Sequence, residues 1–437
     1  MRSIVEFLKR FDYLLFIPII VLLTFSIFYV YSAGVNAQGV LINNEWKKQL
    51  LFATVGLAIF FALTATDYQR FRDVAPLIYA INILLLIAVL IFGVKISGAR
   101  RWLGIGPLGG QPAEFAKIGF ILMVARYLSA YGRNPRHATT LLISGLILLI
   151  PMALTLRQPD FGTAMVFVGI LGMMFFIAGG SAMLLTFFVV ALIWFLIMIF
   201  VPLYYDLIRE QDTWLTTIFT SKEWLARVLL LSGGLLGLSV IGWLTYRKDA
   251  YVLSSYVLST FGFGVGLTWL AHNYFRPYQW DRLRVFINPD IDPLGAGWHI
   301  LQSLTAIGSG GMYGRGYLGG THSHNQFLPE QSTDFIFSII MEERGFIGAI
   351  ILLSAYSILL LRLLFLTLKA QDRFSMLVSG GIFSLLLIHV WVNVGMVIGL
   401  MPIKGVPLFL LSYGGSSVLT MMILLGMVSS ISLRQYR

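Results

Sequence analysis

Residues 327–361 read FLPEQSTDFIFSIIMEERGFIGAIILLSAYSILLL, a polar segment followed by a long apolar one. A helix needs about 20 predominantly apolar residues to cross a bilayer, so the stretch from 333 to 361 predicts a membrane span. Asp334 lies at the entrance of this span, in a chain of which only 12% is charged. The pattern therefore predicts a spanning helix with a carboxylate at its mouth.

The composition of the whole chain is that of a membrane protein. Of its 437 residues, 58% are apolar, and the mean hydropathy is +0.83. Soluble domains carry roughly 25% charged residues, so the sequence predicts an all-α polytopic membrane protein. The absence of cysteine excludes disulfides and thiolate chemistry, and six scattered histidines predict no strong metal site. The net charge of +11 is spread over short loops, which favours an anionic lipid or lipid-linked substrate over a nucleic acid.

About twelve apolar stretches are candidates for membrane spans, and the first is too long for a cleaved signal peptide. One long polar segment, 275–332, contains enough apolar residues to pack, which favours a functional loop over a disordered one. The predicted spans are 11–31, 48–65, 74–94, 113–130, 138–154, 161–178, 182–201, 226–246, 251–274, 333–361, 375–400 and 406–431.

The short loops predict an orientation in the membrane. If both termini are cytoplasmic, the inner loops hold more Lys and Arg than the short outer loops. The positive-inside rule then favours this orientation and places the segment 275–332 outside the membrane.

Three predicted spans begin with a proline followed by an acidic residue, at 111–114, 158–160 and 329–334. Proline suits the first position of a helix, and an acid in the first turn complements the helix dipole. The three motifs open the fourth, sixth and tenth spans, so their carboxylates lie on one side of the membrane. That side also carries the long loop and two basic pairs, Arg100/Arg101 and Arg282/Arg284.

Each of these acids also has a purely structural interpretation. Glu114 can form an ion pair with Lys117 one turn later. Asp160 can cap its helix, and Asp334 can be an acid that complements the dipole, which would lower its pKa and weaken it as a base. Burial among apolar residues acts in the opposite direction. The clustering of acids and guanidinium groups favours general-base chemistry by Asp334 on an anionic lipid-linked substrate.

Four stretches closely resemble the SEDS family of cell-wall proteins. They are 98–127 (GARRWLGIGPLGGQPAEFAKIGFILMVARY), 157–164 (RQPDFGTA), 281–348 and 393–417 (NVGMVIGLMPIKGVPLFLLSYGGSS). The resemblance covers nearly the whole chain and implies one integral-membrane domain over 1–437. Family members usually have ten spans, so the helices expected at 226–274 are identified as an inserted pair. MVARY and the proline in GVPLFLLSYGG favour the elongation branch of the family over the division branch.

The resemblance implies a glycosyltransferase that polymerises lipid II into glycan strands during cell elongation. The donor is the growing chain on undecaprenyl diphosphate, and the acceptor is the 4-hydroxyl of an incoming lipid II. Asp334, in the family's TDF motif, is then the general base, or else it binds a metal or orients the hydroxyl. A diphosphate leaves as a stable anion, so one base and a cationic clamp suffice. A lipid II flippase, a division-type polymerase and a non-catalytic scaffold are the alternatives.

Other residues are candidates for holding the substrate. Trp102 lines a lipid or sugar groove, or else belongs to the interfacial aromatic belt. Ser412 lies in a glycine-rich motif that is either a packing joint or a phosphate-binding backbone. The candidates for the diphosphate clamp, which alternatively snorkel toward headgroups, are Arg101, Arg282, Arg315 and Lys404. The remaining substrate-binding candidates are Glu114, Lys117, Asp160 and Glu330. The sequence indicates no certain cofactor, and a divalent cation (Mg²⁺ or Mn²⁺) bridging the diphosphate is a hypothesis.

The resemblance also implies partners and a location. A class B penicillin-binding protein would supply transpeptidation and pack near the tenth and eleventh spans. MreC-like, MreD-like and MreB-like proteins of the elongation machinery are implied less directly. The expected location is the bacterial cytoplasmic membrane, with both termini cytoplasmic and the active site on the outer face.

Two features of this sequence stand out beside the family pattern. The family usually reads close to GTQSQ where this chain reads GTHSH at 320–324, so His322 and His324 replace amides and add charge below about pH 6.5. Glu342 and Glu343 lie roughly 12–14 Å beyond the start of the tenth span, where ionisable groups predict a functional or partner site.

Overall fold

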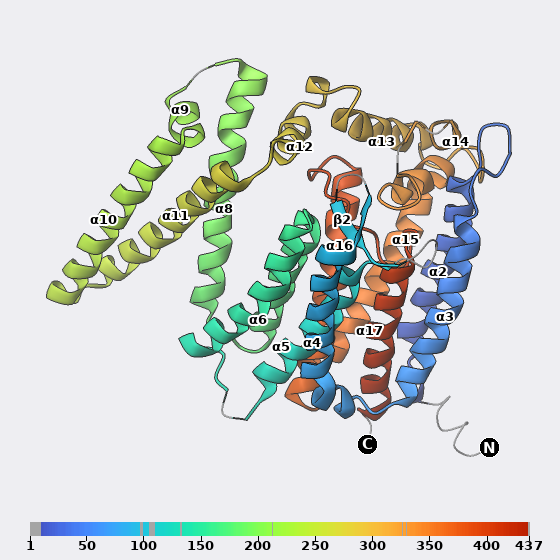
Figure 1. Ribbon diagram of the computed structural model, residues 1–437, viewed down its shortest axis with the longest axis horizontal. Helices are drawn as coiled ribbons and strands as arrows, with labels where there is room; N and C mark the ends of the chain where they lie inside the picture. Colours follow the sequence, from blue (N-terminus) through green and yellow to red (C-terminus); the bar gives the residue numbers. More distant parts are fainter. Residues whose placement is uncertain are drawn as a thin grey trace. The chain divides into compact units, whose positions relative to one another are not determined.

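The structure, a computed structural model, describes residues 10–96, 99–104, 110–131, 133–211, 213–325, 327–328 and 330–435. Its contacts divide the chain into two compact units, unit 1 (Met1–Gly180 and Gln302–Arg437) and unit 2 (Ser181–Leu301). Figure 1 shows that helices dominate both units, so the predicted all-α class is confirmed.

Unit 1 holds the candidate active site. Within the described residues it contains long helices, one short helix and a two-stranded antiparallel hairpin. These elements are α2 (Tyr13–Ala33), α3 (Glu45–Ala65), α4 (Gln69–Phe92), β1 (Val94–Ile96), β2 (Ala99–Trp102), α5 (Pro112–Ser129), α6 (Ala138–Arg157), α7 (Phe161–Ile177), α14 (Thr321–His324), α15 (Ile336–Leu368), α16 (Arg373–Val397) and α17 (Gly415–Arg434).

Unit 2 contains a helix pair that packs together, α10 and α11, which corresponds to the pair predicted at 226–274. Whether this pair is an insertion stays a prediction. The segment 275–332 is built largely of short helices, and its side of the membrane also stays a prediction. The elements of unit 2 are α8 (Ala182–Tyr204), η2 (Tyr205–Arg209), α9 (Trp214–Thr220), α10 (Lys222–Tyr246), α11 (Asp249–Tyr274), α12 (Pro277–Ile287), η3 (Pro289–Ile291) and α13 (Ala296–Gly310), whose end belongs to unit 1.

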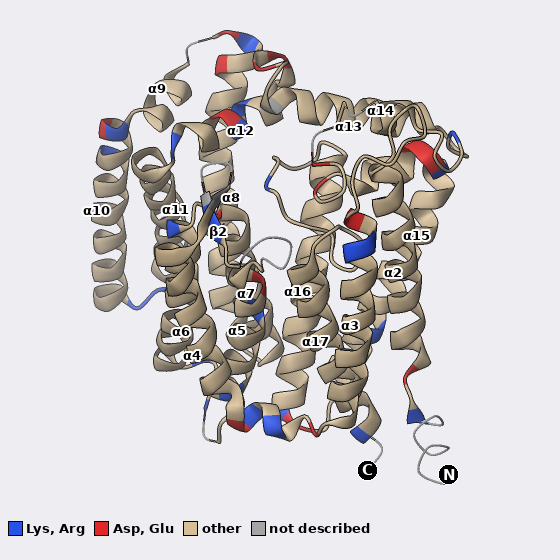
Figure 2. Ribbon diagram, turned by 45° about the vertical axis from the view of Figure 1, so that its right-hand side comes forward, with Lys and Arg blue, Asp and Glu red and all other residues tan. Residues whose placement is uncertain are grey.

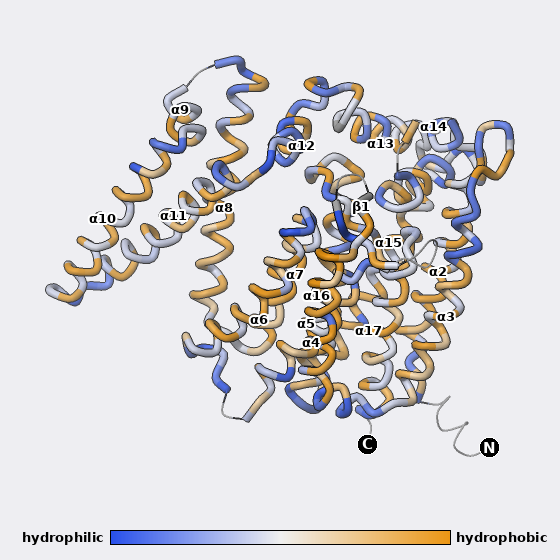
Figure 3. Tube along the Cα trace, viewed as in Figure 1, coloured by the Kyte–Doolittle hydropathy of each residue, from blue (hydrophilic) through white to orange (hydrophobic). Residues whose placement is uncertain are grey.

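Every predicted span corresponds to a helix in the structure. Among the described residues, ten helices are long and apolar enough to cross a membrane. The other two predicted spans are α7, which has 17 residues, and α5, which carries Glu114, Lys117 and Arg126. Figure 3 shows apolar residues along the helix middles and hydrophilic residues at helix ends and loops, as a multi-pass membrane protein requires.

The core of unit 1 lies around α16 and α17. Helix α17 packs against α3 along its length, and α16 packs against α5, α7 and α15 (Figure 1). The backbones of α3 and α17 approach closely because small residues of one helix face large residues of the other. Gly56 of α3 is an example, since a Cβ at this position would lie only 2.8 Å from Met422 Cγ of α17. Because of this tight packing, α17 is largely buried inside unit 1 and exposes little surface to lipid.

At the candidate site, two predicted spans begin before the observed helices. Helix α15 begins at Ile336 and not at 333, because residues 330–335 form a turn in which three backbone N–H groups bond the Glu330 carbonyl. Asp334 therefore precedes the helix and is not in its first turn. Helix α17 begins at Gly415 and not at 406, because the chain from 398 to 414 runs through the bundle without helical structure.

Helix α15 is interrupted at Gly345, whose φ of +65° is in the left-handed region that glycine tolerates. The segment 311–316 lies against the interruption and pairs with its backbone. The Arg315 and Gly316 N–H groups donate to the carbonyls of Glu342 and Glu343, at 3.0 Å each. In return, the Gly311 carbonyl accepts from the Phe346 N–H at 2.9 Å. The groups freed by the break are thus satisfied by a neighbouring loop.

Candidate active site

Asp334 lies beside the backbone of the segment 398–414, which we call the core loop. A Cβ placed on Gly405 would lie 3.2 Å from Asp334 Oδ2, and Gly405 has a φ of +57°. Asn393 of α16 ties the two segments together: its Nδ2 donates to the Asp334 carbonyl at 3.0 Å and to the Val406 carbonyl at 2.8 Å. The half-buried Asp334 carboxylate is therefore held against the core loop.

The core loop is anchored by polar side chains from the surrounding helices. Tyr356 of α15 donates to the Phe409 carbonyl at 2.7 Å, and Ser26 of α2 donates to the Leu411 carbonyl at 2.7 Å. Residues 408–411 are fully buried. Non-helical backbone at membrane depth is stable only when protein groups satisfy it, so these bonds are what permit the loop to run through the bundle.

Lys404 is the residue of the core loop that precedes Gly405. Its Nζ lies 4.7 Å from the centroid of the Phe161 ring, at the start of α7. A Cβ on Gly162 would come within 2.8 Å of the Lys404 carbonyl oxygen, so the loop and the helix are in close contact. Lys404 is half-buried. A cation and the Asp334 carboxylate thus flank the same peptide of the core loop.

Asp160 caps α7, as one of its two interpretations predicted. Its carboxylate accepts from the Thr163 N–H at 3.2 Å and from the Thr163 hydroxyl at 3.0 Å. It also accepts from Gln111 Nε2 at 3.0 Å, which links α7 to the start of α5. Only 4% of Asp160 is exposed. Its established contacts are structural, and a substrate-binding role stays a prediction.

Arg101 reaches the same turn from the hairpin. Its Nε donates to the Gln158 carbonyl at 3.2 Å, and a second N–H donates to the Pro159 carbonyl. The neighbouring Trp102 is 37% exposed, so it presents an aromatic surface beside a guanidinium group. Arg101, Asp160 and Lys404 are therefore connected through the 158–162 segment.

Glu114 and Lys117 form the ion pair that the sequence allowed, at 2.7 Å and almost fully buried. Lys117 Nζ also lies 3.2 Å from His389 Nε2, and His389 Nδ1 lies 2.8 Å from the Pro407 carbonyl oxygen. The ion pair therefore supports the core loop through His389. Sequence reasoning missed His389 and Asn393, although two polar residues four positions apart in an apolar span are a detectable signal.

Among the remaining candidates, Glu330 is in the same turn as Asp334, and its carbonyl accepts from the Asp334 N–H at 3.0 Å. Ser412 is buried, and its hydroxyl accepts from the Leu408 N–H at 2.8 Å, which favours the packing interpretation. Glu330 is exposed in the turn before α15. Arg315 donates to the Thr321 hydroxyl at 2.8 Å, close to the break in α15. Arg282 belongs to α12 of unit 2, where its guanidinium lies 5.8 Å from the centroid of the Tyr278 ring.

Glu342 and Glu343, flagged as functional or partner-site candidates, have structural contacts at the break in α15. Glu342 accepts from the His322 N–H at 2.7 Å and from the Ser323 N–H at 3.0 Å. Glu343 accepts from the Ser32 hydroxyl and lies 3.3 Å from His324 Nε2. The bond to Glu343 raises the pKa of His324 above its usual value, against the opposing effect of burial.

Charged residues of unit 1 concentrate at the ends of its helices, with few along their middles (Figure 2). Among the described residues, no group of three or more His, Asp or Glu side chains could hold a metal ion.

Comparison with known proteins gives a consistent answer. The family model described as "Cell cycle protein", which covers FtsW, RodA and SpoVE, matches residues 12–222 and 234–437. A peptidoglycan glycosyltransferase RodA from Treponema pallidum is 41% identical over 97% of this chain and 98% of its own length. The peptidoglycan glycosyltransferase MrdB of Escherichia coli is 32% identical, over 94% of this chain and 91% of its own.

Solved structures show the same fold. A chain from a peptidoglycan synthase complex, described as coordinating polymerization and crosslinking, is 26% identical and superposes with a TM-score of 0.67. The match covers 98% of this chain and 99% of that one. The rod shape determining protein RodA of Thermus thermophilus superposes with a TM-score of 0.59 at 23% identity, over 98% of both chains.

Proposed function

We propose that this chain, which belongs to the SEDS family of FtsW, RodA and SpoVE proteins, polymerises lipid II into glycan strands as a peptidoglycan glycosyltransferase. The family predicted from the sequence motifs is confirmed. The relatives named peptidoglycan glycosyltransferase support the enzyme class, and the similarity to RodA and MrdB favours the elongation branch.

One observation carries this proposal: a carboxylate and a lysine lie next to the same residue of the core loop, Gly405. Asp334 lies next to Gly405, and Lys404 precedes it in the core loop. A sugar hydroxyl attacks well only when a base removes its proton, and a diphosphate leaves well only when its charge is balanced. Asp334 and Lys404, both next to Gly405, supply these two groups.

In the proposed reaction, Asp334 takes the proton of the acceptor 4-hydroxyl while that oxygen forms a bond to C1 of the donor sugar. The bond from C1 to the diphosphate oxygen breaks, and its electron pair stays on the diphosphate. Lys404 balances the resulting charge, with Arg101 as a second cation held at the 158–159 carbonyls. A divalent cation on the diphosphate stays part of the proposal.

The site belongs, in this proposal, to the outer face of the bacterial cytoplasmic membrane, with both termini cytoplasmic. The positive-inside count supports that orientation. We further propose a class B penicillin-binding protein as partner, packed near α15 and α16, because a structural relative comes from a complex that couples polymerization to crosslinking. MreC-like, MreD-like and MreB-like proteins are more distant proposed partners.

The deciding experiment measures glycan-strand synthesis from purified lipid II, with the protein alone and with its cognate penicillin-binding protein. Asp334→Asn keeps the shape of the side chain but removes the base, so the rate should fall by about 10²–10⁴-fold. Asp249→Asn, a change at an exposed carboxylate at the start of α11, is the matched control and should polymerise normally.

The pH dependence separates the possible roles of Asp334. If it is the base, the wild-type rate falls as the pH drops through the pKa of its carboxyl, and chelators leave that profile in place. A rate that vanishes with chelator and returns with Mg²⁺ or Mn²⁺ would assign Asp334 to metal binding. Normal polymerisation by Asp334→Asn would exclude both roles.

A further inference from the structure

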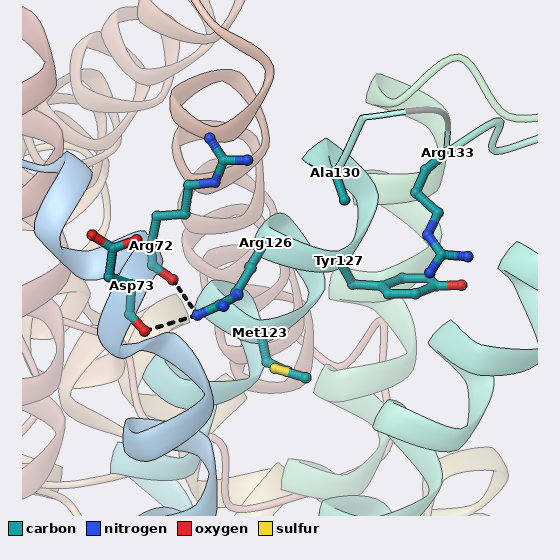
Figure 4. A pocket seen from close by; sticks show the side chains of 7 residues that line it. All are labelled: Arg72, Asp73, Met123, Arg126, Tyr127, Ala130 and Arg133. Carbon is teal, nitrogen blue, oxygen red and sulfur yellow. Dashed lines mark hydrogen bonds between the residues drawn. The ribbon is translucent and has the colours of Figure 1, made fainter.

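A basic pocket of about 420 Å³ lies at the end of α5 that is far from the candidate active site. Glu114 is in the first turn of α5 and Arg126 is in its last turn, about 18 Å away at 1.5 Å per residue. The pocket is formed by the start of α4 and the end of α5 (Figure 4). Its lining residues are Arg72, Asp73, Met123, Arg126, Tyr127, Ala130 and Arg133.

Arg126 has a structural task in this pocket. Pro76 lies inside α4 and has no N–H, so the Arg72 carbonyl lacks its usual helical donor. One guanidinium nitrogen of Arg126 replaces this donor: it donates to the Arg72 carbonyl at 2.9 Å and to the Asp73 carbonyl at 2.7 Å. The side chain of Arg126 is thereby fixed at the wall of the pocket.

The other two arginines are available to a ligand. Within the described residues, no hydrogen bond or ion pair engages the guanidinium of Arg72, which is half-buried. The guanidinium of Arg133 lies over the Tyr127 ring, 4.8 Å from its centroid, and is exposed. The one acid, Asp73, turns its carboxylate away from Arg126 and Tyr127 in Figure 4. Positive charge is therefore in excess around the pocket.

We propose that this pocket binds the phosphate of an anionic phospholipid from the membrane leaflet opposite to Asp334. Planar guanidinium groups match phosphate oxygens in pairs, and a volume of this size accommodates a headgroup. Met123 and Ala130 add an apolar wall on which the first part of an acyl chain can lie. Basic pockets between membrane helices are a known way to hold anionic headgroups, and the predicted orientation puts this end in the cytoplasmic leaflet.

The test measures lipid binding and is independent of polymerase activity. Purified full-length protein in neutral detergent receives phosphatidylglycerol or phosphatidylcholine, followed by thermal unfolding and native mass spectrometry. We expect saturable binding of phosphatidylglycerol, with a rise in the unfolding midpoint, and little effect of phosphatidylcholine. A lack of preference between the two lipids would overturn the proposal.

Variants of the pocket residues test whether phosphatidylglycerol binds in this pocket. Arg72→Gln with Arg133→Gln should raise the apparent dissociation constant for phosphatidylglycerol about tenfold or more. Arg136→Gln, in the same exposed loop as Arg133 but outside the pocket, should leave it unchanged. Ala130→Leu fills the pocket without altering charge and should weaken binding similarly, even if the double variant does not fold. Arg126 is kept because α4 depends on it.

Two outcomes would contradict the inference. Equal affinity of Ala130→Leu and wild type for phosphatidylglycerol would show that the lipid binds elsewhere. Inorganic phosphate that binds and stabilises the protein as well as phosphatidylglycerol does would identify a site for a free anion and not for a lipid. Weak competition by millimolar phosphate, with lipid bound far more tightly, is the expected result.

Discussion

The core loop and the break in α15 both place non-helical backbone inside unit 1, but they satisfy it differently. At the core loop, neutral side chains such as Tyr356, Ser26 and Asn393 donate to backbone carbonyls. At the break, the segment 311–316 pairs with the backbone of α15, and the Glu342 carboxylate accepts from the His322 and Ser323 N–H groups. Both solutions follow from the lack of water in a bilayer core.

The core loop and the break in α15 also differ in the task of the charged side chains beside them. Neutral side chains anchor the core loop at Val406, Phe409 and Leu411, and Asp334 and Lys404 are the charged residues that we propose act on a substrate. The two acids at the break accept hydrogen bonds from His322, Ser323 and Ser32, so their charge is used for structure. The carboxylate that precedes the membrane helix is therefore the proposed base, and the carboxylates within the helix support structure.

The largest effect should come from the ion pair beneath the core loop. Lys117→Met leaves the Glu114 carboxylate buried without its cation, which typically costs about 3–5 kcal/mol. We expect a large fall in the thermal unfolding midpoint and, through His389 and Pro407, a loss of polymerase activity.

Glu114→Gln combined with Lys117→Met is the control, because it removes both charges. Replacement of a whole buried pair is often nearly neutral, so much of the stability should return. If the double variant is as unstable as Lys117→Met alone, the packing of the lysine stem and not its charge holds this region.

A smaller loss of stability is expected at the break in α15. Glu342→Met removes the acceptor of the His322 and Ser323 N–H groups, and two unsatisfied donors cost about 2–4 kcal/mol. Unfolding should become easier while the polymerisation rate per folded molecule stays near that of wild type. Glu223→Met, at an exposed position of α10, should change stability by no more than about 0.5 kcal/mol. A rate loss without a stability loss in Glu342→Met would mean that this acid takes part in the reaction.

The helices of this fold could be predicted from the sequence because each apolar stretch is bounded by polar residues. The two early starts at the candidate site share one cause. The stretches at 333–335 and 406–414 contain one charged residue, Asp334, so they are apolar enough on average to continue a span. Hydropathy contains no information about non-helical backbone buried in protein. Pro402 and Pro407 were the available signal, because each removes a helical N–H donor.

The candidate site could be predicted only in part. Asp334, Lys404, Arg101 and Asp160 were found from motifs, and the structure connects them through the core loop and the 158–162 segment. Asn393 and His389 are visible as two polar residues four positions apart in an apolar span, but their spacing does not identify their partners, the Val406 and Pro407 carbonyls. Such partners depend on tertiary contacts, which periodicity cannot provide.

Asn393 joins the core loop to the backbone of Asp334, the proposed base. Asn393→Leu keeps the branched shape of the side chain but removes the bonds to the Asp334 and Val406 carbonyls. We expect the polymerisation rate to fall about 10–100-fold, equivalent to about 1.4–2.7 kcal/mol in the barrier. The optimum pH should stay unchanged, because the base itself is intact. Ser379→Ala on the same helix is the control, and equal rates for the two variants would remove Asn393 from the positioning of Asp334.

The smallest effect should be a pH dependence at the break. The pKa of His324 is raised in the folded state by Glu343, so its protonation stabilises the fold. This contribution is complete below the unfolded-state pKa of about 6.5 and is lost as the pH rises through the higher folded-state pKa. Relative to His324→Gln, the wild-type unfolding midpoint should therefore fall by a few degrees over that range. His137→Gln, at an exposed loop position, should show no such difference. A constant offset between wild type and His324→Gln at all pH values would show that the ring contributes packing and not charge.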